Sequence, residues 1–182
     1  MNKLLDMNKD VMYKYALVGK FVGEFEQMVS LLRFGCGLIL QNRGLKDFQL
    51  NDIIFGQKLF TADPLIGIYE SFCNELLKSD EENKALLKEI TKFSADFRKI
   101  IEFRNNLLHG EHRYYTNEMD MMVIKKTPDK HGHRIKNIVS SDNDLINKLE
   151  ELALLQKNFI SLLDKVSRVI DDFPDSPHSL AL

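Results

Sequence analysis

The side chains of Arg104 and His109 are the best suited to chemistry in this chain, and they lie five positions apart in the segment RNNLLHG, residues 104–110. A histidine exchanges protons near neutral pH, so it suits general acid or base catalysis. An arginine offers fixed, fork-shaped N–H donors that match phosphate oxygens. These residue types place a proton-transfer group and an anion-binding group at one point of the chain, with Asn105 beside the arginine.

A helical pattern over residues 86–109 places the two side chains on different faces. Nine apolar residues form one arc of the helical wheel: Leu86, Ile90, Phe93, Phe97, Ile100, Ile101, Phe103, Leu107 and Leu108. Arg104 falls near the middle of this arc, whereas His109 lies about 140° away, because each residue of an α-helix turns about 100°. His109 shares the polar edge with Asn105, one helical turn earlier. One chain alone would therefore have difficulty using both side chains at one site.

Both residues also have purely structural interpretations. A buried guanidinium needs a partner, because an unpaired buried charge is costly, and Glu24 or Glu26 of the first helix could supply a salt bridge. His109 could instead satisfy backbone carbonyls at the helix C-terminus, where the helix dipole favours it.

The helix before this segment is one of four long helices that the sequence predicts. The first covers residues 9–41, with an apolar seam at Val11, Tyr15, Val18, Val22, Phe25, Val29, Leu32 and Cys36. Gly19 and Gly23 lie on this helix, where they could let another backbone approach closely. Packing must then offset the helix propensity that each glycine loses, about 1 kcal/mol.

Capping signals predict the other three helices. The second helix runs from Asp63, an N-cap before Pro64, to about residue 78. The third runs from a capping box at residues 79–82 to Gly110. The fourth runs from Ser141, capped together with Asp144, to about residue 172. Between the last two, strand-like runs at residues 114–115, 121–124 and 135–139 flank a turn at 127–132 and predict a β-hairpin. The expected fold class is therefore all-α, a four-helix bundle with a small β-hairpin between the third and fourth long helices.

The composition indicates one ordinary globular domain. The 182 residues are 44% hydrophobic, and we expect a single domain over residues 1–182 with a core at about 10–172 and a short tail at 173–182. A net charge of −2 gives no global attraction to nucleic acid or anionic lipid. Cys36 and Cys73 suit buried apolar positions in a reducing compartment. Because no signal-like or membrane-spanning apolar run occurs, we expect a cytoplasmic protein without membrane association.

The region around the Arg104 segment is locally basic. Between Arg98 and Lys136 there are nine Lys/Arg against five Asp/Glu, together with four of the five histidines. Such a basic region on a net-acidic chain is typical of a phosphate-bearing partner, although solvated hairpins are often charged as well. Tyr114 and Tyr115 could stack on bases or fill a core.

A metal site is the main chemical alternative. His109, Glu111, His112, His131 and His133 are candidate ligands. The segment from His109 to His112 lacks the histidine spacing of a zincin helix, so we expect no metal and no cofactor.

Arg104-Asn105 and His109 resemble the hallmark of the HEPN superfamily, small all-helical domains that include metal-independent ribonucleases. The first helix and the entry to the second, Phe60 to Leu65, resemble the same family, over about residues 10–172. The resemblance implies a homodimer in which two arginine–histidine motifs meet across a two-fold axis. It implies that RNA is cut by attack of its own 2′-hydroxyl on the adjacent phosphate.

Within this resemblance the catalytic residues are Arg104, His109 and Asn105, and the expected RNA-binding residues are Arg98, His112, Arg113, Tyr114, Lys125 and Lys126. HEPN proteins commonly act as toxins with an antitoxin partner or as anti-phage defence effectors. Toxins that nucleotidyltransferase antitoxins modify usually carry a tyrosine two positions after the histidine, where this chain has Glu111. The alternative is a non-catalytic HEPN-like bundle that binds a protein or a nucleotide.

Overall fold

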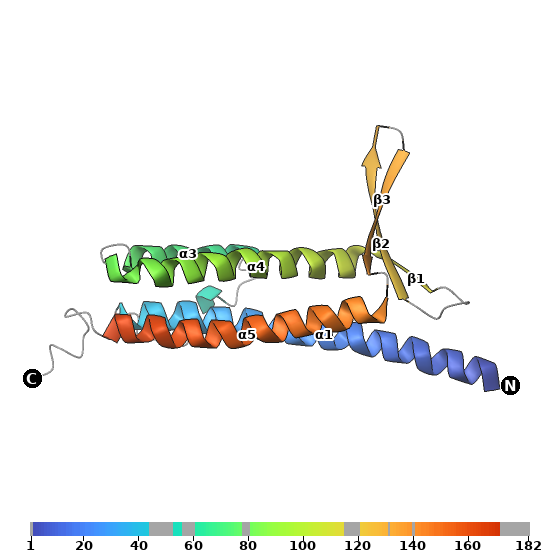
Figure 1. The fold of residues 1–182 in the computed structure, drawn as a ribbon, viewed down its shortest axis with the longest axis horizontal. Helices are drawn as coiled ribbons and strands as arrows, with labels where there is room; N and C mark the ends of the chain where they lie inside the picture. The colour runs from blue at the N-terminus through green and yellow to red at the C-terminus, as the bar shows by residue number, and fades with distance from the viewer. Residues whose placement is uncertain are drawn as a thin grey trace, which may run out of the picture. The chain divides into compact units, whose positions relative to one another are not determined.

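The protein is mainly helical with one small sheet. The structure, a computed structural model, describes residues 2–43, 53–55, 61–77, 81–114, 121–130, 132–139 and 141–171. Its helices are α1 (Asn2–Asn42), α3 (Ala62–Leu77), the 3-10 helix η1 (Glu81–Asn83), α4 (Lys84–His109) and α5 (Asp142–Asp171) (Figure 1). The strands β1 (Glu111–Tyr114), β2 (Met121–Asp129) and β3 (Gly132–Val139) lie between α4 and α5 in the chain. The predicted order of helices and strands is confirmed.

The residues form two compact units. Unit 1 comprises Met1–Phe25 and Lys99–Ala153, and unit 2 comprises Glu26–Arg98 and Leu154–Leu182. Helices α1, α4 and α5 each contribute one end to unit 1 and the other end to unit 2. The organisation as a single domain stays a prediction.

Phe159 of α5 is the centre of the core of unit 2. Its side chain is fully buried, and its ring lies 5.1 Å from Tyr69 of α3, edge-on, and 4.9 Å from Phe93 of α4, stacked. A methyl group added at Gly35 of α1 would lie 3.1 Å from the Phe159 ring and 3.2 Å from the Tyr69 ring. Four helices of unit 2 therefore meet at one aromatic ring.

Cys36 and Cys73 lie in the same core, and both side chains are fully buried. Burial raises the pKa of each thiol from 9.0 to about 12. The folded protein keeps both protons in a pH range where the unfolded chain loses them. Stability from this difference is complete below pH 9 and is lost as the pH rises toward 12.

We therefore expect the free energy of unfolding to fall by about 1.4 kcal/mol per thiol between pH 8 and pH 10. Urea denaturation at the two pH values, with a reductant present, measures the change. The double variant Cys36→Ala/Cys73→Ala should be less stable at both pH values but should lose much less stability on going to pH 10. An equal loss in the variant and the wild type would contradict this expectation.

Unit 1 packs around Phe103 of α4. The ring lies 5.2 Å from Phe21 of α1, edge-on, and the Lys148 ammonium of α5 lies 5.9 Å from its centre. Phe21, Val123 of β2 and Val139 of β3 are fully buried, so the helices and the sheet of this unit share an apolar core. The end of α4 that carries the Arg104 segment belongs to this unit.

The sheet is antiparallel in the order β1-β2-β3. β2 and β3 pair from Asp129 opposite Gly132 back to Val123 opposite Val139, so the predicted hairpin is confirmed and β1 adds a third strand. The predicted turn at 127–132 was too long, because pairing continues through Pro128. Among the described residues, β1 pairs with β2 only at Met121 to Ile124, so the edge of β2 at Pro128 has no described partner strand, and a missing N–H is tolerated there.

Two helix starts differ from the sequence predictions. α1 begins at Asn2 rather than at residue 9, and α3 begins at Ala62 because the Leu65 N–H already donates to the Thr61 carbonyl at 3.1 Å. Asp63 therefore lies in the first turn instead of at the N-cap. The capping box predicted at 79–82 falls partly outside the described residues, and α4 begins at Lys84 after η1.

The predicted start of the last helix is confirmed. The Ser141 N–H donates to the Asp144 carboxylate at 3.0 Å, which is one half of a capping box. In the described part of the chain, no helix combines the length and the apolarity needed to cross a membrane.

The seam predicted for α1 is wrong at one position, since the side chain of Tyr15 is 52% exposed while Phe21 and Met28 are fully buried. At Gly19 and Gly23, no other described part of this chain makes the close approach that glycine would allow. A methyl group at either glycine would meet nothing within 4 Å.

Candidate functional site

A partly buried hydrogen bond joins the last turn of α4 to the sheet. Asn106 is only 5% exposed, and its Oδ1 accepts a hydrogen bond from Lys125 Nζ of β2 at 2.7 Å. Because a buried amide must be satisfied by a partner, this bond fixes one turn of α4 against one residue of β2. The sequence analysis missed this role of Asn106 and placed Lys125 among the RNA contacts. The sequence contained one signal for this role. Asn106 lies three residues after Phe103, a member of the apolar arc, so the two residues share a helix face, whereas Asn105 does not share it.

His112 of β1 makes a second connection to the end of α4. Its Nε2 lies 3.0 Å from the Leu107 carbonyl, one of the last four carbonyls of the helix, which have no partner within the helix. The contact requires Nε2 to carry the proton and to donate it. His112, predicted to contact RNA, is half-buried and holds the helix terminus.

Gly110 ends α4, as predicted, and the reason is close packing. A methyl group there would lie 2.5 Å from Val123 Cγ1, 2.7 Å from the Asn106 carbonyl oxygen and 3.2 Å from the Ile124 carbonyl oxygen. Two of these three atoms are backbone atoms, which cannot rotate away. Only glycine therefore lets β2 approach the end of α4 this closely.

Gly110→Ala should lower the free energy of unfolding by about 1–3 kcal/mol, because the sheet must shift to admit the methyl group. Gly23→Ala is the matched control, since the added methyl group meets nothing in the described residues and raises helix propensity. The control should raise stability by roughly 0.5–1 kcal/mol. Chemical denaturation measures both variants, and a change of the same sign in both would contradict the packing described for Gly110.

Arg104 lies on the inner face of this helix end, as the helical wheel predicts. Its guanidinium carbon lies 5.4 Å from the centre of the Phe25 ring of α1, a cation–π geometry. Its Nη1 donates to Asn105 Oδ1 at 3.3 Å. The half-buried guanidinium is therefore oriented by an aromatic ring below it and an exposed amide beside it.

His109 is the last residue of α4, and its side chain is exposed. Among the described residues it has no hydrogen-bond or ion-pair partner, so its imidazole is available to a ligand. The separation inferred from the helical wheel therefore holds: Arg104 packs against α1, while His109 faces solvent.

The lysines predicted to contact RNA already have partners in unit 1. Lys125 donates to Asn106, and Lys126 Nζ lies 2.7 Å from Glu111 Oε2. Both lysines are exposed, and the Lys126–Glu111 pair is close to half exposed on each side, so it contributes little stability. Their charges therefore stay accessible at the surface.

The three remaining predicted contacts are Arg98, Arg113 and Tyr114. Arg98 belongs to unit 2, where it forms ion pairs with Asp63 at 3.4 Å and Glu70 at 3.2 Å and links α4 to α3. Arg113 and Tyr114 pair with Met122 and Met121 as residues of β1, and their side chains are outside the described set. Arg104, Asn105, His109 and His112 are brought together at one helix end, whereas Arg98 is not part of that unit.

No group of three or more histidine, cysteine, aspartate or glutamate side chains that could hold a metal ion occurs among the described residues. His131 lies outside them, and so does the side chain of His133, so these two candidate ligands of the metal alternative are not tested.

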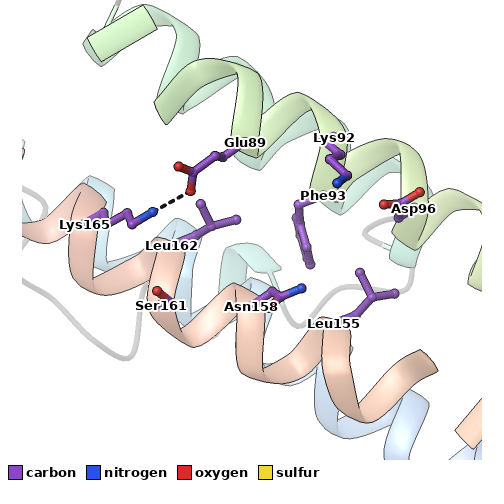
Figure 2. A pocket seen from close by; sticks show the side chains of 9 residues that line it. All are labelled: Glu89, Lys92, Phe93, Asp96, Leu155, Asn158, Ser161, Leu162 and Lys165. Atoms are coloured by element: carbon purple, nitrogen blue, oxygen red, sulfur yellow. Dashed lines mark hydrogen bonds and ion pairs between the residues drawn. The ribbon is translucent and has the colours of Figure 1, made fainter. Parts of the chain in front are cut away.

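A pocket of about 290 Å³ lies in unit 2 between α4 and α5 (Figure 2). Phe93, Leu155 and Leu162 form its apolar part, and the Glu89–Lys165 ion pair, at 2.5 Å, crosses one side of it. None of the residues that line it is a histidine or a cysteine. The volume is at the lower end of the range for ligand pockets. The end of α4 in unit 1 is therefore the stronger candidate for chemistry.

Comparisons with protein-family models, with curated proteins and with solved structures found no match to this chain. The functional interpretation consequently depends on the chemistry of the end of α4 and on the resemblance of its residues to the HEPN hallmark.

Proposed function

We propose that this protein is a HEPN-type, metal-independent endoribonuclease whose catalytic residues are Arg104, Asn105 and His109. The observation that carries the proposal is the exposed imidazole of His109 at the end of α4, one helical turn after the Arg104–Asn105 hydrogen bond. A proton-transfer group and a phosphate-binding group thus share a short segment that is firmly attached to a sheet.

The residue types support a reaction that needs no metal. The 2′-oxygen of RNA attacks the adjacent phosphorus, the bond from phosphorus to the 5′-oxygen breaks, and a 2′,3′-cyclic phosphate and a 5′-hydroxyl result. His109 takes the proton from the 2′-hydroxyl or gives a proton to the leaving 5′-oxygen. Arg104 donates hydrogen bonds to the phosphate oxygens, where negative charge builds up. Asn105 holds the guanidinium in place through its Oδ1.

The different orientations of the two side chains favour a site made by two chains. Arg104 packs against Phe25 while His109 faces solvent, so one chain would reach a single phosphate with both groups only awkwardly. In a two-fold dimer, Arg104 of one protomer and His109 of the other act on the same phosphate. A cytoplasmic toxin or anti-phage effector, restrained by an antitoxin or another defence protein, is the context that the family resemblance favours.

Incubation of the purified protein with an RNA oligonucleotide in EDTA tests the proposal. A matched 2′-deoxy oligonucleotide of the same sequence is the control, because it lacks the attacking hydroxyl. We expect RNA products that end in a 2′,3′-cyclic phosphate and an intact deoxy strand. Cleavage that stops in EDTA, or equal cleavage of both strands, would refute the proposal, and so would no cleavage of any RNA, which would favour the non-catalytic binding module.

A further inference from the structure

The hairpin formed by β2 and β3 has a charge opposite to that of the rest of the chain. Residues 121–139 hold five cationic side chains, Lys125, Lys126, Lys130, Arg134 and Lys136, against one aspartate, Asp129. The whole chain has 25 Lys/Arg and 27 Asp/Glu, so the remaining residues have 20 against 26. All five cationic side chains are exposed. The positive charge is therefore concentrated at the surface of this hairpin.

The register of the strands places three of these cations on one face. Lys125 lies directly opposite Lys136, and Arg134 lies opposite Thr127, two residues along the same strand pair. Residues opposite each other across an antiparallel pair point to the same face, and so do residues two apart on one strand. Like charges directly opposite each other destabilise a sheet. An anion bound on this face would relieve that repulsion.

The contacts that Lys136 and Lys125 make within unit 1 neutralise these two cations only weakly. Lys136 Nζ lies 3.8 Å from Glu102 Oε1, and both side chains are about two-thirds exposed, so the pair contributes little. Lys125 donates to Asn106, which is neutral, so its charge is held in place without being cancelled.

We propose that the hairpin face formed by Lys125, Arg134 and Lys136 binds the sugar–phosphate backbone of the nucleic-acid strand that the Arg104–His109 site cuts. The inference rests on the proposed function and deepens it, because it assigns the substrate a second binding surface. By the register, this face carries three cations against one aspartate position, Asp129, so its net charge is positive and binding is driven by phosphates and depends strongly on salt.

The connection between hairpin and helix favours a nucleic acid as the occupant. Lys125 is bonded to Asn106, three residues before His109 on α4. A strand bound along the hairpin therefore continues toward the end of α4, where a phosphate must lie for the proposed reaction. The hydrogen bond from Lys125 to Asn106 keeps this cation in a fixed position relative to the last turn of α4.

Fluorescence anisotropy with a labelled 2′-deoxy oligonucleotide tests the inference without cleavage. We expect Arg134→Gln/Lys136→Gln to bind roughly tenfold more weakly than the wild type at low salt. The slope of log Kd against log salt should also decrease by about 1.4, since each single-strand phosphate contact contributes about 0.7. The matched control is Lys88→Gln/Lys157→Gln, which removes two exposed cations of unit 2 and should bind like the wild type.

Three results would overturn the inference: unchanged binding by the hairpin variant, equal weakening by the control variant, or displacement of the oligonucleotide by polyglutamate at the same charge concentration. The last result would mean that the face selects an acidic protein as readily as a nucleic acid. Because the probe cannot be cut, these outcomes are independent of catalysis. Suppose that the wild type does not cut RNA, but that the hairpin variant binds the oligonucleotide more weakly and the control variant does not. The proposed ribonuclease function then fails, while binding of nucleic acid by the hairpin face stands.

Discussion

His109→Ala should lower the rate of RNA cleavage by about 10²- to 10⁴-fold, the contribution typical of a positioned general acid or base. The imidazole is exposed at the end of α4 and has no partner among the described residues. Its removal should therefore leave the folded structure almost unchanged. Initial rates on a defined RNA oligonucleotide, measured for both proteins at equal concentration, give the comparison.

Leu108→Ala is the matched control for His109→Ala. Leu108 is the preceding residue of the same helical turn, and its side chain is 40% exposed. The control should keep most of the activity, and both variants should unfold at nearly the denaturant concentration of the wild type. A His109→Ala protein that is as active as the control would exclude His109 from catalysis.

Phe159→Ala should lower the free energy of unfolding by about 3–5 kcal/mol, the range for a large aromatic side chain removed from a core. The fully buried ring contacts Tyr69 and Phe93, and Gly35 leaves it space on α1. Its loss leaves a cavity at the point where α1, α3, α4 and α5 meet in unit 2. Because native stability is typically only about 5–15 kcal/mol, the variant should be close to unfolding. Urea denaturation measures the change.

Ile160→Ala tests whether the loss of stability comes from the buried position of Phe159 or from truncation of any large apolar side chain in this part of α5. Ile160 is the next residue of α5, but its side chain is 56% exposed, so its truncation should change stability by less than about 0.5 kcal/mol. Similar losses in the two variants would show that Phe159 is not the centre of the core of unit 2.

The long helices could be predicted because their apolar periodicity is strong. In α5, Leu145, Leu152, Phe159 and Val166 follow one another at intervals of seven residues, about two helical turns, and all four are buried. The seam of α1 was less reliable at Tyr15, because periodicity shows which side of a helix is apolar but not how far each neighbour covers it. The start of α3 was misplaced by two residues, since Thr61 and Asp63 are both suitable caps and only the backbone geometry distinguishes them.

The candidate site was predicted in part. The separation of Arg104 from His109 followed from the helical repeat and is confirmed by the contact with Phe25 and the exposure of His109. Gly110 was predicted to end the helix, but its close packing against β2 and the bond between Asn106 and Lys125 were not, because both depend on where β2 passes the end of α4. A lysine that holds an asparagine and a lysine that binds a phosphate are indistinguishable in a sequence.

Mixing two inactive variants tests the central claim that Arg104 of one chain and His109 of another act on the same RNA phosphate. Arg104→Ala and His109→Ala are each purified, mixed under conditions that exchange subunits, and assayed on RNA in EDTA. A mixed dimer has one site that lacks both residues and one that retains both. We therefore expect each variant alone to be inactive and the mixture to regain a substantial fraction of the wild-type rate. A mixture as inactive as its components would contradict a site shared between two chains.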